Sequence, residues 1–247
     1  MPNEIVDPAA GAGRHRPSEH GDPIGLPVAD WRGAPVPAPV TLTGRHAVVE
    51  PLTAGHAAAL FAAYAADASG RLWTYMGKGP FAEAGSLTAW LEEVCGAPDP
   101  LFFHLRRPGG EPIGMAALMR IQPAVGVIEI GHIAIVPAAQ RTRAATEALT
   151  LMMAHALDGL GYRRLEWKCD ALNAASRRAA LRFGFRFEGI FLNALVYKGR
   201  NRDTAWFAIT DAEWPSRRAA IQAWLDDANF DEEGRQRRAL RTLREGA

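Results

Sequence analysis

One helix between two strands constrains the fold of this 247-residue chain more than any other feature. From residue 145 to 160 the apolar side chains recur at helical spacing and form a single stripe that ends at Gly161. A segment of alternating apolar and polar residues, typical of a strand, runs from Gly126 to Pro137 before this helix. Residues 163–171 form a second predicted strand after it. A strand, helix and strand in this order make a crossover connection, so we expect at least one parallel pair of strands.

The remaining elements follow an order typical of a mixed α/β protein. The sequence predicts a strand, two helices, three strands, a helix, a strand, a helix, two strands and a final helix. Outside the crossover, the predicted strands span 40–52, 101–121 (a hairpin), 185–197 and 203–209, and the predicted helices span 54–67 and 83–94, a short segment after Asn173, and a segment from Asp211 onward. We therefore expect an α/β fold with a mixed, mostly antiparallel central sheet and flanking helices.

Three regions differ in composition. Residues 1–39 hold eight of the 17 prolines and no periodic apolar pattern, which predicts an extended arm that either docks through Trp31 or is a disordered leader. Residues 40–210 form the predicted folded domain, and residues 211–247 form an amphipathic helix with an arginine-rich tail. The whole chain has 28 basic and 27 acidic residues, a balance that suits a globular protein.

The sequence lacks the features of disulfide-rich, metal-binding, membrane-spanning and secreted proteins. Its two cysteines are too few for a disulfide framework, and no Cys/His spacing predicts a metal site. No apolar run approaches the roughly 18 to 20 residues that span a bilayer, and the N-terminus does not resemble a signal peptide. We expect a cytoplasmic protein without membrane contact.

The positive charge is concentrated between residues 141 and 202, which hold 12 Lys or Arg against five Asp or Glu. Such segregation indicates an anionic ligand: a nucleic acid, an anionic membrane or a phosphorylated cofactor. Arg141 and Arg143 lie where a strand turns into a helix, and the unpaired amides of a helix N-terminus suit pyrophosphate. We do not expect nucleic-acid binding, because stacking aromatic residues do not alternate with the arginines.

Two stretches carry a family resemblance. The segments "IEIGHIAIVPAAQRTRAATEAL" and "NAASRRAALRFGFRFEG" resemble the GNAT superfamily of acetyl-CoA-dependent N-acetyltransferases, and most of all its branch of ribosomal-protein N-terminal acetyltransferases. The resemblance extends over about Val40 to Ile209. It implies that residues 40–210 are an acetyltransferase domain with a splayed parallel pair, that acetyl-CoA is the co-substrate, and that the partner is an amine acceptor.

The resemblance also implies where acetyl-CoA binds. In the family, backbone amides after the fourth strand hold the pyrophosphate within the pattern Gln/Arg-x-x-Gly-x-Gly/Ala. Gln140 and Ala145 match its ends, but Arg143 replaces the central glycine, and we expect an unstrained backbone there. The expected cofactor-binding residues are Ile133, Ile135, Val136, Gln140, Arg141, Thr142, Arg143, Ala144, Ala145 and Asn173.

A proton donor for the departing thiolate is implied by the second stretch. The family pattern of Asn-x-x-Ser/Ala followed by Gly-Phe is present as Asn173, Ser176, Gly184 and Phe185. Many relatives use a tyrosine one turn after the serine, where this chain has Ala180. Ser176 is therefore the candidate donor, and a capping serine is the alternative interpretation.

An acceptor for the proton of the amine is also needed. Glu129, His132 and Glu166 are candidates, and strict alternation places Glu129 and His132 on opposite faces of the sheet. Each could instead be structural, as an ion-paired acid or a histidine within the sheet. The resemblance implies that amides near a bulge at Ile133 to Val136 stabilise the oxyanion. Cys169 is expected to be a core residue rather than an acyl carrier.

These observations predict an N-acetyltransferase that moves an acetyl group directly from acetyl-CoA to a primary amine on a small molecule or a protein N-terminus. The alternative is a catalytically weak module on the same fold that binds CoA or a partner. Acceptor specificity is expected in the two helices after the first strand, around Leu72 to Phe81 with Trp73 and Tyr75, and in the last hairpin. The C-terminal helix and the N-terminal arm are candidate contacts of a homodimer, although packing on their own domain is the simpler expectation.

Overall fold

The computed structural model describes residues 15–245 and divides into two compact units, Met1–Gly33 and Ala34–Ala247. In the described part of the first unit, β1 (His15–Pro17) pairs with β2 (Pro23–Gly25) as a short antiparallel hairpin. Residues 1–14 of the predicted arm lie outside the described residues.

The end of the predicted arm packs within the second unit. The Ala34 amide donates to the Pro123 carbonyl at 2.9 Å, and the Tyr162 hydroxyl donates to the Pro35 carbonyl at 3.1 Å. Residues from Ala34 onward are therefore anchored beside the turn that joins two central strands.

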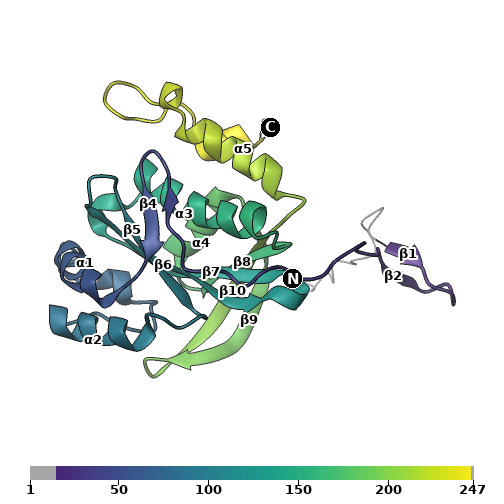
Figure 1. Cartoon of the computed structure of the whole chain (residues 1–247), viewed down its shortest axis with the longest axis horizontal. Coiled ribbons are helices and arrows are strands. Elements are labelled where there is room, and N and C mark those ends of the chain that lie inside the picture. The colour runs from purple at the N-terminus through teal and green to yellow at the C-terminus, as the bar shows by residue number, and fades with distance from the viewer. Residues whose placement is uncertain (1–14, 246–247) are drawn as a thin grey trace. The chain divides into compact units, whose positions relative to one another are not determined.

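An eight-stranded sheet organises the second unit, in the order β3-β4-β5-β6-β7-β8-β10-β9 (Figure 1). Its strands are β3 (Leu42–Thr43), β4 (Val48–Pro51), β5 (Leu101–Arg106), β6 (Pro112–Gln122), β7 (Val127–Ile135), β8 (Arg164–Asp170), β9 (Arg186–Tyr197) and β10 (Arg200–Thr210). All neighbours pair antiparallel except β7 and β8, which are parallel. The predicted mixed, mostly antiparallel sheet is confirmed.

Helices cover both faces of this sheet. They are α1 (Ala57–Tyr64), α2 (Ala84–Val94), α3 (Arg143–Ala154), α4 (Ala174–Phe183), α5 (Trp214–Leu225) and α6 (Leu240–Glu245). On one face, Trp90 of α2 meets Phe102 of β5 edge to face. On the other face, α3 packs on the strands from β3 to β7, and Phe183 of α4 packs on Trp167 of β8. Among residues 15–245, no helix combines the length and the apolar character needed to cross a bilayer.

Local signals explain where the two helices nearest the site begin. Thr142 precedes α3, and its hydroxyl accepts a hydrogen bond from the Ala145 amide at 3.2 Å. Asn173 precedes α4 and accepts from the Ser176 amide at 3.0 Å. Both residues are good N-caps because a side-chain oxygen satisfies an amide that the helix leaves unpaired.

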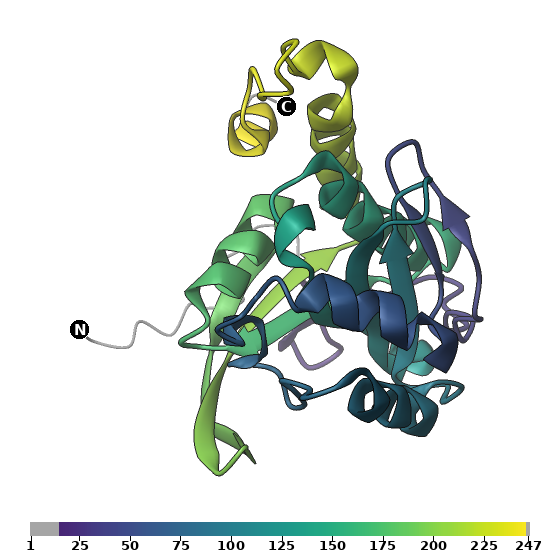
Figure 2. The same ribbon diagram turned by 90° about the vertical axis from the view of Figure 1, so that its left-hand side faces the viewer.

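Two predicted elements differ from the structure. The predicted strand 40–52 is interrupted, because the amides of Arg45 and Ala47 turn toward the Glu147 carboxylate of α3, at 3.1 and 2.8 Å, and separate β3 from β4. The predicted arginine-rich tail includes a further helix, α6, which packs on α5. Figure 2 shows these C-terminal helices above α3 and α4, and α5 contacts α3 while α6 contacts α4.

Candidate active site

A gap opens between the two parallel strands at the centre of the sheet. The pairing of β7 with β8 ends at Glu129 and Glu166, although β7 continues to Ile135 and β8 to Asp170. Beyond that point β8 pairs only with β10 on its other side. The two strands therefore diverge, as the resemblance implied, and leave an unpaired edge of β7 facing the gap.

A bulge in β7 lies beside this gap. Met115 pairs with Ala134 and Ala117 with Gly131, so that one residue of β6 faces two residues of β7. One of those two is His132, whose φ of 49° is unusual for a residue with a side chain.

Close packing of β6 supports the bulge. Gly114 has a φ of 144°, and a Cβ atom at this position would lie 2.0 Å from the Ala134 carbonyl oxygen. Only glycine fits, so the approach of β6 to β7 depends on a missing side chain.

The bulge determines which amides face the gap. The Val136 amide donates to the Ile113 carbonyl at 2.9 Å and points toward β6. The expectation that Val136 contributes a free amide is therefore wrong. Alternation back along the strand directs the amide of Ile135 toward the gap. The Ile135 carbonyl accepts a hydrogen bond from the Gln140 side chain at 3.2 Å.

The turn before α3 leaves some amides free and occupies others. The amides of Gln140 and Thr142 donate to carbonyls three residues earlier, both at 3.3 Å, and the Ala145 amide donates to the Thr142 hydroxyl. Within residues 15–245, the amides of Arg141, Arg143 and Ala144 have no protein acceptor. These three amides meet at a helix N-terminus, the arrangement that binds phosphate.

The arginine that replaces the family glycine does not strain this turn. Arg143 is the first residue of α3, and the left-handed backbone falls on Arg141, with a φ of 63°. The Arg143 guanidinium donates to Asp227 at 2.8 Å and lies 4.2 Å from the centre of the Phe230 ring. Arg45 also pairs with Asp227, and the two arginines hold the pKa of this carboxyl below its usual value, Arg143 most strongly. Arg143 is thus held by the C-terminal segment.

Ser176 lies on α4 beside β8 and is half-buried. Its hydroxyl oxygen accepts a hydrogen bond from the Trp167 indole at 2.9 Å. Burial raises the pKa of the neighbouring Cys169 thiol, although the Ser176 hydroxyl acts in the opposite direction. Cys169 therefore remains a buried thiol, which makes it a poor nucleophile.

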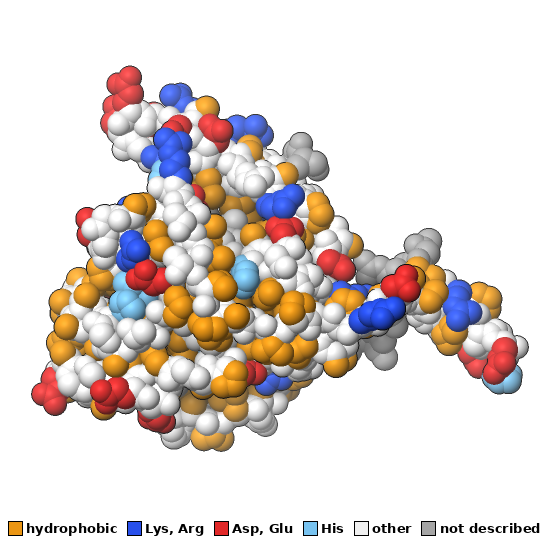
Figure 3. All heavy atoms as spheres, viewed as in Figure 1, with side chains coloured by type: hydrophobic (Ala, Val, Ile, Leu, Met, Phe, Trp, Pro, Cys, Tyr) orange, Lys and Arg blue, Asp and Glu red, His pale blue; other side chains and the backbone are white. Residues whose placement is uncertain are grey.

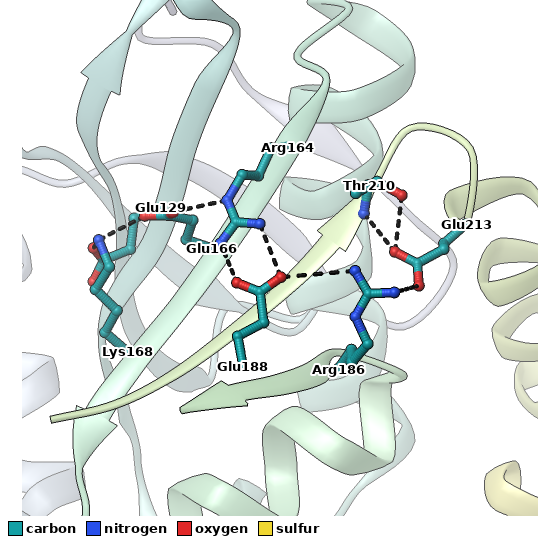
Figure 4. A network of polar contacts seen from close by, with 8 residues as sticks. All are labelled: Glu129, Arg164, Glu166, Lys168, Arg186, Glu188, Thr210 and Glu213. Carbon is teal, nitrogen blue, oxygen red and sulfur yellow. Dashed lines mark hydrogen bonds and ion pairs between the residues drawn. The ribbon is translucent and has the colours of Figure 1, made fainter. Parts of the chain in front are cut away.

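The two candidate glutamates meet on one lysine (Figure 4). The Lys168 ammonium lies 3.0 Å from a Glu129 oxygen and 2.6 Å from a Glu166 oxygen, and all three side chains are buried. Burial raises the pKa of Glu129, and Lys168 and Arg120 partly offset this. The Lys168 ammonium also lies 3.8 Å from the centre of the Trp206 ring. Both carboxylates are thus committed to an ion-paired cluster.

This cluster continues to the surface. Arg164 donates to Glu166 at 2.8 Å and to Glu188 at 3.0 Å, and Arg186 reaches both Glu188 and Glu213. Figure 4 shows the chain of alternating charges that runs from the centre of the sheet to the start of α5.

His132 does not point away from Glu129, so the expectation of opposite faces is wrong. Gly131 pairs with Ala117, which pairs with Phe102, and Glu129 shares the face of Gly131. The His132 ring nevertheless lies 5.0 Å from the Phe102 ring on this same face, because the bulge breaks the alternation. Burial, and to a smaller extent Arg202, lowers the pKa of His132, so its imidazole is neutral at neutral pH.

The structure shows the partners of two tyrosines near the site, which the sequence did not indicate. The hydroxyl of Tyr64 in α1 donates to the Ala134 carbonyl at the bulge, at 2.9 Å. The hydroxyl of Tyr197 donates to the buried Asp170 at the end of β8, at 2.8 Å. Neither contact has a short-range sequence signal, because the partners are about 70 and 27 residues apart.

The tip of the β9–β10 hairpin packs against the loop before α2. Lys198 donates to the Trp73 carbonyl at 2.8 Å, and Arg200 donates to the Thr74 carbonyl at 2.7 Å. These contacts join the two regions where acceptor specificity was expected.

A second polar cluster lies outside the gap, at the start of α1. His104 and His56 stack with ring centres 4.3 Å apart, and Glu50 accepts from His104 at 3.1 Å. The same Glu50 oxygen accepts from Arg106 at 2.9 Å. The arginine already neutralises this carboxylate, so we interpret the group as a structural charge cluster.

Comparison with known proteins identifies the class that this fold and site define. A family model described as the acetyltransferase (GNAT) domain matches residues 46–186. The chain belongs to the GNAT family and is an acyltransferase. Among curated proteins, none matches the sequence significantly.

Solved structures agree with this family. A GCN5-related N-acetyltransferase from Brucella melitensis is 46% identical, with a TM-score of 0.86 over 88% of this chain and 100% of that one. A GNAT-family protein from Chromobacterium violaceum is 39% identical, with a TM-score of 0.73 over 78% of this chain and 98% of that one. RimJ from Mycobacterium smegmatis, in complex with CoA-disulfide, shares the fold at 22% identity, with a TM-score of 0.60 over 72% of this chain and 88% of that one. The first two are more similar to this chain than RimJ is.

Proposed function

We propose that this protein transfers an acetyl group from acetyl-CoA to a primary amine, on a small molecule or a protein N-terminus, within one ternary complex. The observation that carries the proposal is the gap between β7 and β8, which opens next to the free amides before α3. A long, narrow cofactor with a diphosphate and an amide-bearing arm fits both features.

The donor would bind through two sets of amides. Those of Arg141, Arg143 and Ala144, with the dipole of α3, suit the diphosphate. The amide of Ile135, and that of Ile133 beside the bulge, would suit the pantetheine arm or the thioester oxygen. Asn173, at the start of α4, accepts a hydrogen bond from the Ser176 amide, and we assign it to the pantetheine arm. The RimJ structure with CoA-disulfide supports a CoA site on this fold.

Ser176 is suited to protonate the departing thiolate. Its oxygen accepts from the Trp167 indole, so its own hydrogen remains available to another acceptor. A small rotation would turn that hydrogen to the sulfur of the leaving group. The hydroxyl would then stabilise the thiolate as the bond to the acetyl carbon breaks.

His132 is the best placed acceptor for the amine proton, ahead of Glu129 and Glu166. The two carboxylates form ion pairs with Lys168, whereas the His132 imidazole is neutral and packs against the Phe102 ring. A neutral imidazole beside the bulge can take a proton directly or through one water molecule.

The state of Cys169 supports direct transfer. Its thiol is buried and its pKa is raised, so that a thiolate able to carry the acetyl group does not form readily. The acceptor amine would therefore attack the thioester itself.

Two measurements test the proposal. Isothermal titration with CoA should show binding, and a thiol-release assay with acetyl-CoA should show turnover on at least one amine in a panel of small amines and short peptides with free N-termini. Binding without turnover on any amine would instead favour a CoA-binding module. Failure to bind CoA would overturn the proposal altogether.

A further inference from the structure

Two arginines near the phosphate turn lie against an aromatic pair in the C-terminal segment. The Arg143 guanidinium lies 4.2 Å from the centre of the Phe230 ring, and the Arg182 guanidinium lies 4.5 Å from the centre of the Trp224 ring. The two rings pack edge to face, with centres 5.2 Å apart. The C-terminal segment thus orients one cation from α3 and one from α4.

The two arginines differ in how their charge is compensated. Arg143 is paired with Asp227 at 2.8 Å. Arg182 donates to the Thr146 hydroxyl at 3.2 Å and forms no ion pair with an Asp or Glu among residues 15–245. It is also half-buried and close enough to Arg141 for the two charges to repel, and burial and Arg141 together lower its pKa. A desolvated cation next to a second cation is costly unless an anion joins them.

The position of Arg182 indicates which anion that is. Its hydrogen-bond partner Thr146 lies in the first turn of α3, and the Thr146 hydroxyl in turn donates to the Thr142 carbonyl at 3.0 Å. Arg182 is therefore within one helical turn of the free amides of Arg143 and Ala144. A diphosphate bound by these amides would extend its charge toward the guanidinium.

We propose that Arg182 binds a phosphate group of the acetyl donor and that Trp224 is its positioning residue. This inference rests on the proposed acetyl-CoA site and extends that site into α5, which lies outside the matched residues 46–186. Stacking on the indole holds the guanidinium plane and leaves its edge donors free for phosphate oxygens. Figure 3 shows basic and acidic side chains close together over the C-terminal helices.

The test compares two acetyl donors, since only one carries phosphate. In Arg182→Gln, kcat/KM with acetyl-CoA should fall about tenfold to a hundredfold, the loss expected for one charge-assisted hydrogen bond. With S-acetylpantetheine, which lacks the nucleotide and its phosphates, kcat/KM should change less than about twofold. Arg182→Lys should recover part of the loss because it keeps the charge.

The matched control is an arginine on α5, the helix that carries Trp224, whose side chain is not near the turn before α3. Arg218 lies on α5 and pairs with Asp158 at 3.0 Å. Arg218→Gln should leave kcat/KM unchanged with both acetyl donors. Trp224→Phe should leave the ratio of kcat/KM for acetyl-CoA to kcat/KM for S-acetylpantetheine unchanged. Trp224→Leu should lower this ratio, as Arg182→Gln does.

Titration with CoA and dephospho-CoA then locates the phosphate. Equal losses of affinity in Arg182→Gln indicate the diphosphate, and a loss confined to CoA indicates the 3′-phosphate. Unchanged affinity for both ligands, or equal losses of kcat/KM on both acetyl donors, would overturn the role of Arg182 while the proposed function stands. A wild-type protein that neither binds CoA nor uses acetyl-CoA would overturn both.

Discussion

Lys168 offers a direct test of the buried charge cluster. Its ammonium joins Glu129 and Glu166, and its side chain is only 6% exposed. Lys168→Met keeps most of the length of the side chain but removes its charge and the contact of the ammonium with Trp206. Two buried carboxylates then face each other on paired positions of β7 and β8.

The expected cost follows from the contacts that remain. Removing one partner of a buried ion pair typically costs about 3–5 kcal/mol. Arg164 still donates to Glu166 at 2.8 Å, and Arg120 still lies 3.5 Å from Glu129, so we expect a value near the lower end. For a chain of this size, about 3 kcal/mol corresponds to a fall in Tm of roughly 6–12 °C.

The loss should depend on pH in a defined direction. The pKa of Glu129 is already raised by burial, and Lys168 is the main influence that lowers it, so the variant raises it further. Between the unfolded pKa and this raised folded pKa, the folded state binds more protons than the unfolded state. Stability of the variant therefore falls as pH rises through this window, and the deficit is smaller in acid.

Urea unfolding at pH 7.5 and pH 5 measures both effects. Arg186→Met is the control, because Arg186 is in the same network but 47% exposed, and its loss should cost less than about 1 kcal/mol. A Lys168→Met protein within 1 kcal/mol of wild type, or a deficit of equal size at both pH values, would refute the assignment of Lys168 as the charge that holds this cluster together.

Three further predictions concern the gap. Ser176→Ala should lower kcat by about a hundredfold with little change in the KM for acetyl-CoA, and an unchanged kcat in steady-state assays would place the proton donor elsewhere. His132→Gln should abolish the acidic limb of the kcat/KM profile, whose pKa we expect below the ordinary histidine value; a limb that persists would point to a carboxylate. Gly114→Ala should cost more stability in thermal unfolding than Gly189→Ala, because both glycines have strongly positive φ but only the first would clash with Ala134; equal losses would disprove the close approach.

Much of the fold could be predicted because its signals are local. The apolar stripe of α3 and the cap Asn173 each depend on residues within a few positions. The parallel pair follows from the strand–helix–strand crossover, because such a connection joins parallel strands with one strongly preferred hand. The order of strands and helices was predicted for the same reason.

The predictions failed where the backbone departs from regular geometry or where distant segments meet. The face of His132 and the partner of the Val136 amide both depend on one extra residue in β7, which no periodicity shows. The ion pair between Arg143 and Asp227 could not be predicted either, because the two residues are 84 positions apart in the sequence. Likewise, nothing local indicated that Lys168 would bridge the two candidate glutamates.

Three departures from regular backbone lie at the proposed site. Gly114 and His132 support the bulge, and Arg141 bends the turn that exposes the amides, each with a positive φ. Such conformations are unfavourable by about 1–3 kcal/mol each for residues with side chains, and they persist only where the surrounding structure enforces them. A sheet selected for stability alone would keep β7 paired with β8 along its length. The gap, the bulge and the turn together expose backbone donors along one path, and this path is what a thioester donor with a diphosphate requires.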